Sequence, residues 1–346
     1  MLPFIEETDL AHIWKHAAQC IPELNSARLF ITGGTGFFGC WLLESLCYAK
    51  AHFGLQTELI VLTRDPQAFL KKMPHLASMP GLQLLAGDVT TFTYPSGEFT
   101  HVIHAATQAS ATLNEEQPLI MLDTITEGTQ HTLEFAAQAK VQKFLLTSSG
   151  AVYGVQSPTV SHVNETCSNA PDPLQSTSAY GLGKRMAEHL CAVYAKQYGF
   201  EVKIARCFAF VGPYLPLTSH FAIGNFINNA RQQNPIQILG DGSPYRSYLY
   251  AADLVVWLWT ILCQGESGRA YNVGSEEAIN MSDLATLIAQ TASMKIPVVI
   301  AKKADPSALP ARYIPQTRRA QNELNVRQHI SLEDSIQRTL RWSLYQ

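Results

Sequence analysis

The sequence predicts an α/β fold, in which a doubly wound parallel sheet is followed by a smaller C-terminal α+β lobe. Short apolar runs alternate with segments of helical spacing from Arg28 to about residue 207, the pattern of strands buried between two layers of helices. Beyond that point, Gly-Pro, Asn-Pro and Gly-Asp-Gly breaks divide the chain into shorter elements. A length of 346 residues and a hydrophobic content of 47% are enough for two packed units of this kind.

Residues 1–27 are predicted to form an N-terminal helical extension that packs on the outside of the next unit, because residues 9–20 have helical spacing. The first domain is predicted over residues 28–207. Its strands are expected at 28–32, 58–63, 82–86, 101–105, 143–148 and 202–205, and its helices at 37–51, 119–139 and 179–198.

Residues 208–346 are predicted to form mainly the smaller lobe, with a return to the first domain near residues 245–275. Helices are expected at 223–232, 252–263, 281–291 and 331–343, and strands near 236–239, 270–273 and 296–300. The cleft between the two units is the expected ligand site.

The composition disfavours several classes of protein. A net charge of −3 without a long basic block gives no reason to expect binding to nucleic acid or to an anionic membrane. The seven cysteines are scattered, with no Cys-x-x-Cys pair, which predicts reduced thiols and no zinc site. The first residues are acidic, and the most apolar window, 254–263, is shorter than a membrane span. We therefore predict a cytoplasmic protein with no metal and no membrane contact.

A glycine-rich turn follows the first predicted strand. Residues 32–39 read Thr-Gly-Gly-Thr-Gly-Phe-Phe-Gly, and a helical pattern begins at once. Gly33 would permit the turn, Gly36 would let the backbone approach a phosphate, and Gly39 would let helix and strand pack closely. A strand, a tight turn and a helix N-terminus hold a dinucleotide pyrophosphate in Rossmann-type domains, so we predict such a site here. The alternative is an ordinary turn between strand and helix.

A tyrosine and a lysine open the helix predicted at 179–198. Their spacing of four residues places Tyr180 and Lys184 on one face. A phenol with a pKa of about 10 is a poor base at neutral pH, and a neighbouring ammonium would lower that pKa and make Tyr180 usable for proton transfer. A simple pairing on the helix surface is the alternative. Ser148 and Ser149 end a predicted strand, where a hydroxyl can bond a substrate oxygen or merely cap a turn.

These features occur in one order along the chain with several further motifs. The set comprises 32–39, His104-Ala105-Ala106, 148–154, Tyr180 with Lys184, Arg206 with Gly212-Pro213, and Arg246-Ser247-Tyr248 with Asp253. In this order the motifs resemble those of the extended short-chain dehydrogenase/reductases, and within them the NAD(P)-dependent nucleotide-sugar epimerase/dehydratase family. The resemblance runs from about residue 27 to the C-terminus.

The resemblance implies a hydride-transfer site acting on a nucleotide-activated sugar. Tyr180 would be the acid/base on a sugar hydroxyl, Lys184 would hold the nicotinamide ribose and lower the Tyr180 pKa, and Ser149 matches the family's serine or threonine. Asp88 matches the position that bonds the adenine amino group. The residues that the resemblance places around the dinucleotide are Gly33, Thr35, Gly36, Phe37, Phe38, Gly39, Arg64, Asp88, Val89, Ala105, Ala106, Thr107, Tyr180 and Lys184.

The resemblance also implies substrate contacts beyond Ser149. Arg246 and Arg312 match basic positions that grip the diphosphate of the sugar nucleotide, where guanidinium groups suit phosphate; surface arginines or ion pairs are the alternative. His220 lies where a GDP-fucose-synthase-like relative carries a histidine that protonates a sugar carbon. We expect His220 to contact substrate, with catalysis or a structural role as alternatives. His104 is expected to be packed or to line the cleft.

The departures from the family pattern limit the reaction. The 4,6-dehydratases carry an Asp-Glu pair where this chain has Gly150 and Ala151, and the decarboxylases carry a glutamate at the position of Ala151. Without these carboxylates neither reaction is expected by its usual route. Ala209 replaces an asparagine that usually lies near the substrate phosphate, and Ile125 replaces another habitual asparagine.

The end of the second predicted strand bears on the choice of cofactor. NAD-specific relatives place an acidic residue there, which bonds the ribose hydroxyls, whereas an arginine pairs with the 2′-phosphate of NADP. Arg64 therefore predicts NADP, and Asp65 keeps NAD as the alternative.

Three functions remain open. The first is an epimerase that oxidises a sugar carbon, usually C4, and returns hydride to the opposite face. The second is an NADPH-dependent reductase of a 4-keto-6-deoxy sugar nucleotide, and the third is a non-catalytic dinucleotide sensor. A homodimer is also implied, through a four-helix bundle of the helices at 119–139 and 179–198. The apolar residues proposed for its seam are Leu133, Ala136, Ala137, Leu190 and Val193.

Overall fold

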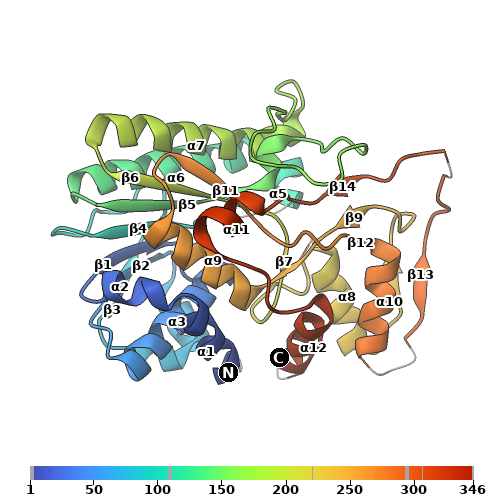
Figure 1. Cartoon of the computed structure of the whole chain (residues 1–346), viewed down its shortest axis with the longest axis horizontal. Coiled ribbons are helices and arrows are strands. Elements are labelled where there is room, and N and C mark those ends of the chain that lie inside the picture. The colour runs from blue at the N-terminus through green and yellow to red at the C-terminus, as the bar shows by residue number, and fades with distance from the viewer. Residues whose placement is uncertain (1–3, 108–110, 220, 293–295, 306, 345–346) are drawn as a thin grey trace.

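The main feature of the fold is a seven-stranded parallel sheet with the order β11-β6-β5-β4-β1-β2-β3 (Figure 1). The structure is a computed structural model that describes residues 4–107, 111–219, 221–292, 296–305 and 307–344. The strands are β1 (Arg28–Thr32), β2 (Glu58–Thr63), β3 (Leu82–Ala86), β4 (His101–His104), β5 (Lys143–Ser149), β6 (Glu201–Cys207) and β11 (Arg269–Val273). Because the order reverses between β1 and β4, the carboxyl ends of these two strands border a crevice, the usual ligand site of such sheets. The prediction of a Rossmann-type α/β fold is confirmed.

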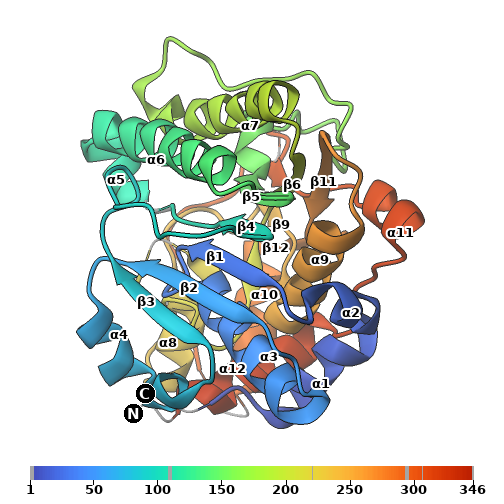
Figure 2. The ribbon, with the colours of Figure 1, turned by 90° about the vertical axis from the view of Figure 1, so that its left-hand side faces the viewer.

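Helices cover both faces of the sheet (Figure 2). These are α6 (Pro118–Gln138) and α7 (Ala179–Tyr198) on one face, and α3 (Phe37–Phe53) and α9 (Ala251–Gln264) on the other. Successive side chains of a strand point to opposite faces, so Phe30 packs beneath α6 while its neighbours Leu29 and Ile31 pack beneath α3. All three side chains are fully buried, which explains why β1 reads as an unbroken apolar run.

The N-terminal segment belongs to the second of these helical layers. It contains α1 (Glu7–His16), a 3₁₀ turn η1 (Ala18–Cys20) and α2 (Ile21–Leu24). Trp14 of α1 is buried, stacks on Trp259 of α9 with ring centroids 6.1 Å apart, and donates its Nε1–H to the Ser45 carbonyl of α3 at 2.7 Å. The segment is therefore part of the hydrophobic core. We had expected it to pack only on the outside of the first domain.

The buried carboxylate of Asp9 on α1 links Tyr250 to the last described helix of the chain. Asp9 accepts a hydrogen bond from the Tyr250 hydroxyl at 2.6 Å. It also forms an ion pair with Arg338 of α12 (Leu332–Ser343). Burial raises the pKa of Asp9, and the contacts with Tyr250 and Arg338 oppose that rise.

The smaller lobe has its own apolar core, built around α8 (Ala222–Arg231) and α10 (Met281–Thr291). Two short parallel strands, β8 (Ile236–Ile238) and β13 (Val298–Ile300), pair beside these helices. Two-residue strands form the remaining sheets: β12 (Ile279–Asn280), β9 (Tyr245–Arg246) and β14 (Arg312–Tyr313) in one, and β7 (Phe210–Val211) and β10 (Leu249–Tyr250) in the other. These pairs were not predicted, and they carry several residues of the candidate site.

The other described elements are short. They are α4 (Pro66–Lys72), η2 (Pro74–Ser78), α5 (Ala111–Glu116), η3 (Gly150–Tyr153), η4 (Ser176–Ser178) and α11 (Arg318–Leu324). Over the described ranges, no helix combines the length and apolar character needed to cross a membrane, and no group of three or more His, Cys, Asp or Glu side chains is placed to hold a metal ion.

Candidate active site

The glycine-rich turn lies at the crevice, between β1 and the start of α3. Gly33 has φ +71°, and a Cβ on it would lie 2.5 Å from the Ala105 carbonyl at the end of β4, so only glycine fits. A Cβ on Gly39 would lie 2.3 Å from Gly34, so the first turn of α3 packs directly on the loop. At Gly36 a Cβ would meet a single atom, at 3.4 Å. Space beside Gly36 and a bare helix N-terminus are what a pyrophosphate needs.

The other residues expected around a dinucleotide come from the carboxyl ends of β1, β3 and β4. The Thr32 hydroxyl accepts from the Ala106 amide at 3.2 Å and contacts His104 Nδ1 at 2.8 Å. His104 is fully buried and also bonds Thr129, and burial lowers its pKa to about 3. His104 is thus a neutral packing residue that braces the end of β4.

The tip of β2 presents Arg64 to solvent, while Asp65 has a structural task. Asp65 caps α4 by accepting from the Ala68 amide at 2.9 Å. Thr90 donates two hydrogen bonds to Asp88, and these lower the Asp88 pKa, with a smaller contribution from Arg64. Asp65 therefore has a structural role, while Arg64 lies exposed beside it at this strand tip.

Tyr180, Ser149 and Lys184 converge beneath the carboxyl ends of β4 and β5. Burial raises the pKa of Tyr180, and a hydrogen bond with the Ser149 hydroxyl opposes that rise. Lys184 is buried and donates to Thr107 Oγ1 at 2.7 Å and to the Thr147 carbonyl at 2.9 Å, and burial lowers its pKa to about 8. In this structure the Ser149 hydroxyl lowers the pKa of Tyr180, against the larger effect of burial. The lowering expected from Lys184 stays a prediction.

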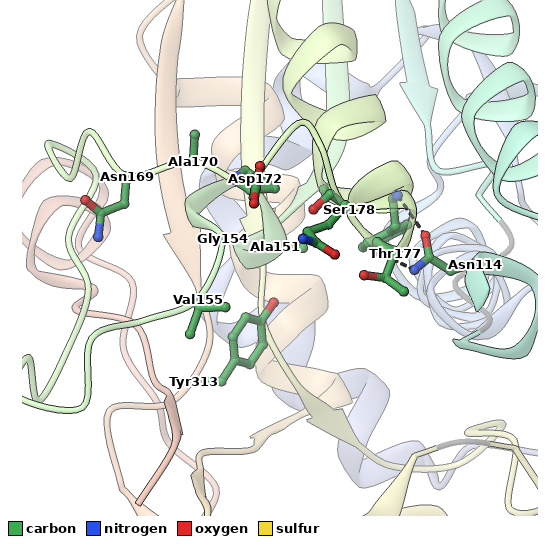
Figure 3. A pocket seen from close by; sticks show the side chains of 14 residues that line it. Asn114, Ala151, Gly154, Val155, Asn169, Ala170, Asp172, Thr177, Ser178 and Tyr313 are labelled. Atoms are coloured by element: carbon green, nitrogen blue, oxygen red, sulfur yellow. Dashed lines mark hydrogen bonds between the residues drawn. The ribbon is translucent and has the colours of Figure 1, made fainter. Parts of the chain in front are cut away.

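Asn114 of α5 fixes the start of the catalytic helix (Figure 3). Its carboxamide oxygen accepts from the Tyr180 amide at 2.9 Å, and its nitrogen donates to the Thr177 carbonyl at 2.7 Å. The four first amides of a helix lack partners within it, so this contact both satisfies one of them and sets the position of Tyr180. Sequence reasoning missed Asn114, because nothing in its local pattern marks a residue that acts across 66 positions.

A pocket of about 670 Å³ opens beside these residues (Figure 3). Tyr180, Ala151 and Tyr313 line its inner end, and the loop that follows η3 forms much of its rim. The remaining lining residues are Asn114, Gly154, Val155, Asn169, Ala170, Pro171, Asp172, Gln175, Thr177, Ser178 and Gly181. A ligand in this pocket can therefore reach the side chain of Tyr180.

Tyr313 is the main residue of the site that the sequence did not reveal. It comes from β14, far along the chain, and its phenol lies near the Ser149 hydroxyl, which lowers the Tyr313 pKa against the larger effect of burial. Its ring lies 4.7 Å from the ring of Phe208. A Cβ on Gly150 would lie 2.7 Å from both the Tyr313 oxygen and the Phe208 ring. The space beside Gly150 is therefore filled by the Phe208 ring and the Tyr313 phenol.

The two arginines expected at the diphosphate lie on neighbouring strands but on opposite faces. β14 pairs with β9 so that Tyr313 lies opposite Arg246, and Arg312 opposite Tyr245. Paired residues share a face. The Arg246 guanidinium accordingly lies 5.9 Å from the Tyr313 ring, and the Arg312 guanidinium lies 4.6 Å from the Tyr245 ring. Arg246 therefore shares the face of Tyr313, which lines the pocket, and Arg312 lies on the other face of this sheet. His220 lies outside the described residues.

The comparisons with known proteins agree with this geometry. The profile of the NAD dependent epimerase/dehydratase family matches residues 29–274. UDP-glucuronic acid decarboxylase 1 of Arabidopsis thaliana is 30% identical over 311 residues, which cover 90% of this chain and 68% of that protein.

Two solved structures show the same fold. UDP-glucose 4-epimerase from Thermotoga maritima, solved with UDP-glucose, superposes with a TM-score of 0.76 at 20% identity and covers 91% of this chain and 98% of its own. UDP-glucuronic acid 4-epimerase from Bacillus cereus, solved with UDP-glucuronic acid and NAD, gives 0.75 at 22% identity with the same coverage. From the profile match and the relative at 30% identity, the chain belongs to the NAD-dependent epimerase/dehydratase family and is an enzyme of the extended short-chain dehydrogenase/reductase type.

Proposed function

We propose that this enzyme epimerises a nucleotide-activated sugar at C4 by NAD(P)-dependent hydride transfer. The bound nicotinamide would accept and return the hydride. Tyr180 takes the proton of the sugar hydroxyl as the carbon is oxidised, and Ser149 donates a hydrogen bond to the resulting carbonyl oxygen. The ketone then presents its other face, and Tyr180 returns the proton. Lys184, anchored on Thr107 and the Thr147 carbonyl, would hold the cofactor ribose.

The observation that carries this proposal is that the residues for hydride transfer are present, while the space beside Gly150 is filled by other side chains. Tyr180 and Ser149 are in contact, whereas the space next to Gly150 is taken by Phe208 and Tyr313. Elimination of water needs a further acid and base near the sugar, and the resemblance to the decarboxylases implies a glutamate at the position of Ala151. Among the described pocket residues Asp172 alone carries a carboxylate, which accepts from the Leu174 amide at 2.9 Å in the rim loop. We therefore do not extend to this chain the decarboxylation named for its Arabidopsis relative.

The preferred cofactor in this proposal is NADP. Arg64 is exposed at the strand tip, and Asp65 is engaged as a helix cap. The Bacillus neighbour was solved with NAD, which keeps NAD as the alternative. Arg64 also favours a second candidate function, reduction of a 4-keto-6-deoxy sugar nucleotide, because NADPH is the usual cellular reductant.

The test is incubation of the purified protein with UDP-, GDP-, CDP- and dTDP-hexoses and with their 4-keto-6-deoxy forms, with products read by NMR. Inversion at C4, with a dinucleotide that stays bound through turnover, would support the epimerase. Consumption of one NADPH per 4-keto sugar, with no inversion of hexoses, would establish the reductase instead. Tyr180→Phe is the matched control, because it keeps the ring and removes the reactive hydroxyl.

We also propose a homodimer formed through α6 and α7, with a seam that keeps Val193 but not Leu133 or Ala136 of the residues expected. Leu133 and Ala136 are fully buried within their own subunit, so they cannot supply it. The exposed apolar side chains on these two helices are Leu119, Ile120, Met186, Val193 and Tyr198. Sedimentation at micromolar concentration should give the mass of two chains, and Val193→Glu should lower it to one. A monomeric wild-type protein would refute this proposal.

A further inference from the structure

Three hydroxyl groups form a row at the inner end of the pocket. Ser149 lies in the middle, and its hydroxyl is near enough to the phenols of Tyr180 and Tyr313 to lower the pKa of each. The Tyr313 oxygen lies beside Gly150, the residue that follows Ser149. The Ser149 oxygen also accepts from the Ala151 amide at 3.1 Å. The three partners come from α7, β14 and η3, so the row joins elements that are distant in the sequence.

A serine hydroxyl has one hydrogen to donate and two lone pairs that accept. The Ala151 amide, which can only donate, occupies one lone pair. If Tyr313 donates to the second, the single Ser149 hydrogen has one remaining direction, toward Tyr180 and the sugar oxygen beside it. We propose that Tyr313 is a positioning residue that orients Ser149 as a hydrogen-bond donor toward Tyr180. This inference rests on the proposed hydride-transfer function.

Tyr313 is suited to donate because it stays protonated. It is half-buried and packs against Phe208, and desolvation raises its pKa. The titratable groups that face it are Tyr180 of α7, Cys207 of β6 and Arg246 of β9. Burial also raises the pKa of the Cys207 thiol to about 12. Near neutral pH both Tyr313 and Cys207 are therefore uncharged, and the ionisation that matters in this cluster is that of Tyr180.

The backbone holds Tyr313 in place from both sides. β14 pairs with β9, which sets Tyr313 opposite Arg246. The next residue, Ile314, donates its amide to Gln156 Oε1 at 2.9 Å and accepts from the Val163 amide at 2.9 Å. The phenol then occupies the space that Gly150 leaves without a side chain. A phenol held in this way can act on Ser149 without reorganisation during the reaction.

The test compares Tyr313→Phe with Tyr245→Phe in the full-length protein. Both variants keep the aromatic ring, and Tyr245 lies on the opposite face of the same small sheet. In the reaction found by the substrate panel, Tyr313→Phe should lower kcat by about tenfold and move the acidic limb of the kcat/KM profile upward by about half a unit to one unit, as expected for the loss of one oriented hydrogen bond. Tyr245→Phe should leave both unchanged. If Tyr313→Phe raises KM but leaves the pH profile of kcat/KM unshifted, the proposal is overturned. Tyr313 would then only contact the sugar.

A double-mutant cycle gives the second criterion. In the Ser149→Ala background, Tyr313→Phe should change kcat by less than about twofold, because the group through which Tyr313 acts is gone. An equal factor in both backgrounds would overturn the proposal.

A third measurement needs no turnover and so separates this inference from the proposed function. With tyrosine labelled by ¹³C at Cζ, and the Tyr180 resonance assigned by its loss in Tyr180→Phe, Tyr180 should titrate at higher pH in Tyr313→Phe than in wild type. An identical titration would refute the role of Tyr313 even if the epimerase activity is found. The shift would support that role even if the reaction proves to be a reduction.

Discussion

Replacing Gly150 with alanine tests whether aromatic rings fill the position at which relatives carry an acid. Gly150 is not among the residues with positive φ, so an alanine can adopt its backbone conformation, and the effect comes from the added methyl group alone. That methyl would lie 2.7 Å from the Phe208 ring and 2.7 Å from the Tyr313 oxygen. Ordinary contact begins at about 3.4 Å, so both groups must retreat.

Overpacking of this kind costs about 1–3 kcal/mol, which for a chain of this length lowers Tm by about 1–4 °C. Turnover should fall by about 10- to 100-fold, because Tyr313 and Ser149 are displaced from each other. Calorimetry and steady-state kinetics measure the two effects. Gly240→Ala is the matched control, since nothing lies within 4 Å of a Cβ there and its φ is also not positive. Adding Phe208→Leu should recover part of the stability lost by Gly150→Ala. A Gly150→Ala protein with wild-type Tm and turnover would show that the position is open and would refute this packing argument.

The remaining predictions concern the reaction, the cofactor and pH. Tyr180→Phe should bind the dinucleotide normally but lose about 10²-fold or more in turnover, and near-wild-type turnover would remove it from the mechanism. Arg64→Ala should weaken NADP(H) by about 1.5–3 kcal/mol in titrations while leaving NAD(H) unchanged; equal losses would contradict the strand-tip argument. Lys184 is neutral in the fold above its pKa of about 8 but charged in the unfolded chain up to about 10.5, so wild type should gain stability relative to Lys184→Met as pH rises through this window. A flat difference in urea unfolding would contradict it. No 4-keto-6-deoxy product from dTDP-glucose, CDP-glucose or GDP-mannose, and no decarboxylation of UDP-glucuronate, should appear above about 0.1 per second.

The main sheet and the core of the redox site could be predicted because their signals are local. β1 and β2 are continuous apolar runs, and the Tyr180–Lys184 spacing defines a helix face by itself. Substitutions at Gly150 and Ala151 were also visible in the sequence, although what fills the space was not.

The parts that could not be predicted depend on pairing between distant segments. Tyr313 reaches Ser149 only because a two-residue strand pairs with β9, and such strands carry too few residues for a periodic pattern. The same pairing separates Arg246 from Arg312, which look equivalent in the sequence. On α6, the helical pattern did not distinguish Leu133, which faces the enzyme's own sheet, from the exposed Leu119.

The buried carboxylate of Asp9 has a consequence for motion around the pocket. Tyr250 leads into α9 beneath the sheet, while Arg338 belongs to the helix that packs in the core of the smaller lobe. Pulling these two apart would leave a charge in a dry interior without its partner, which is strongly unfavourable. We therefore expect this point to act as a fixed pivot when the enzyme admits and releases its ligands.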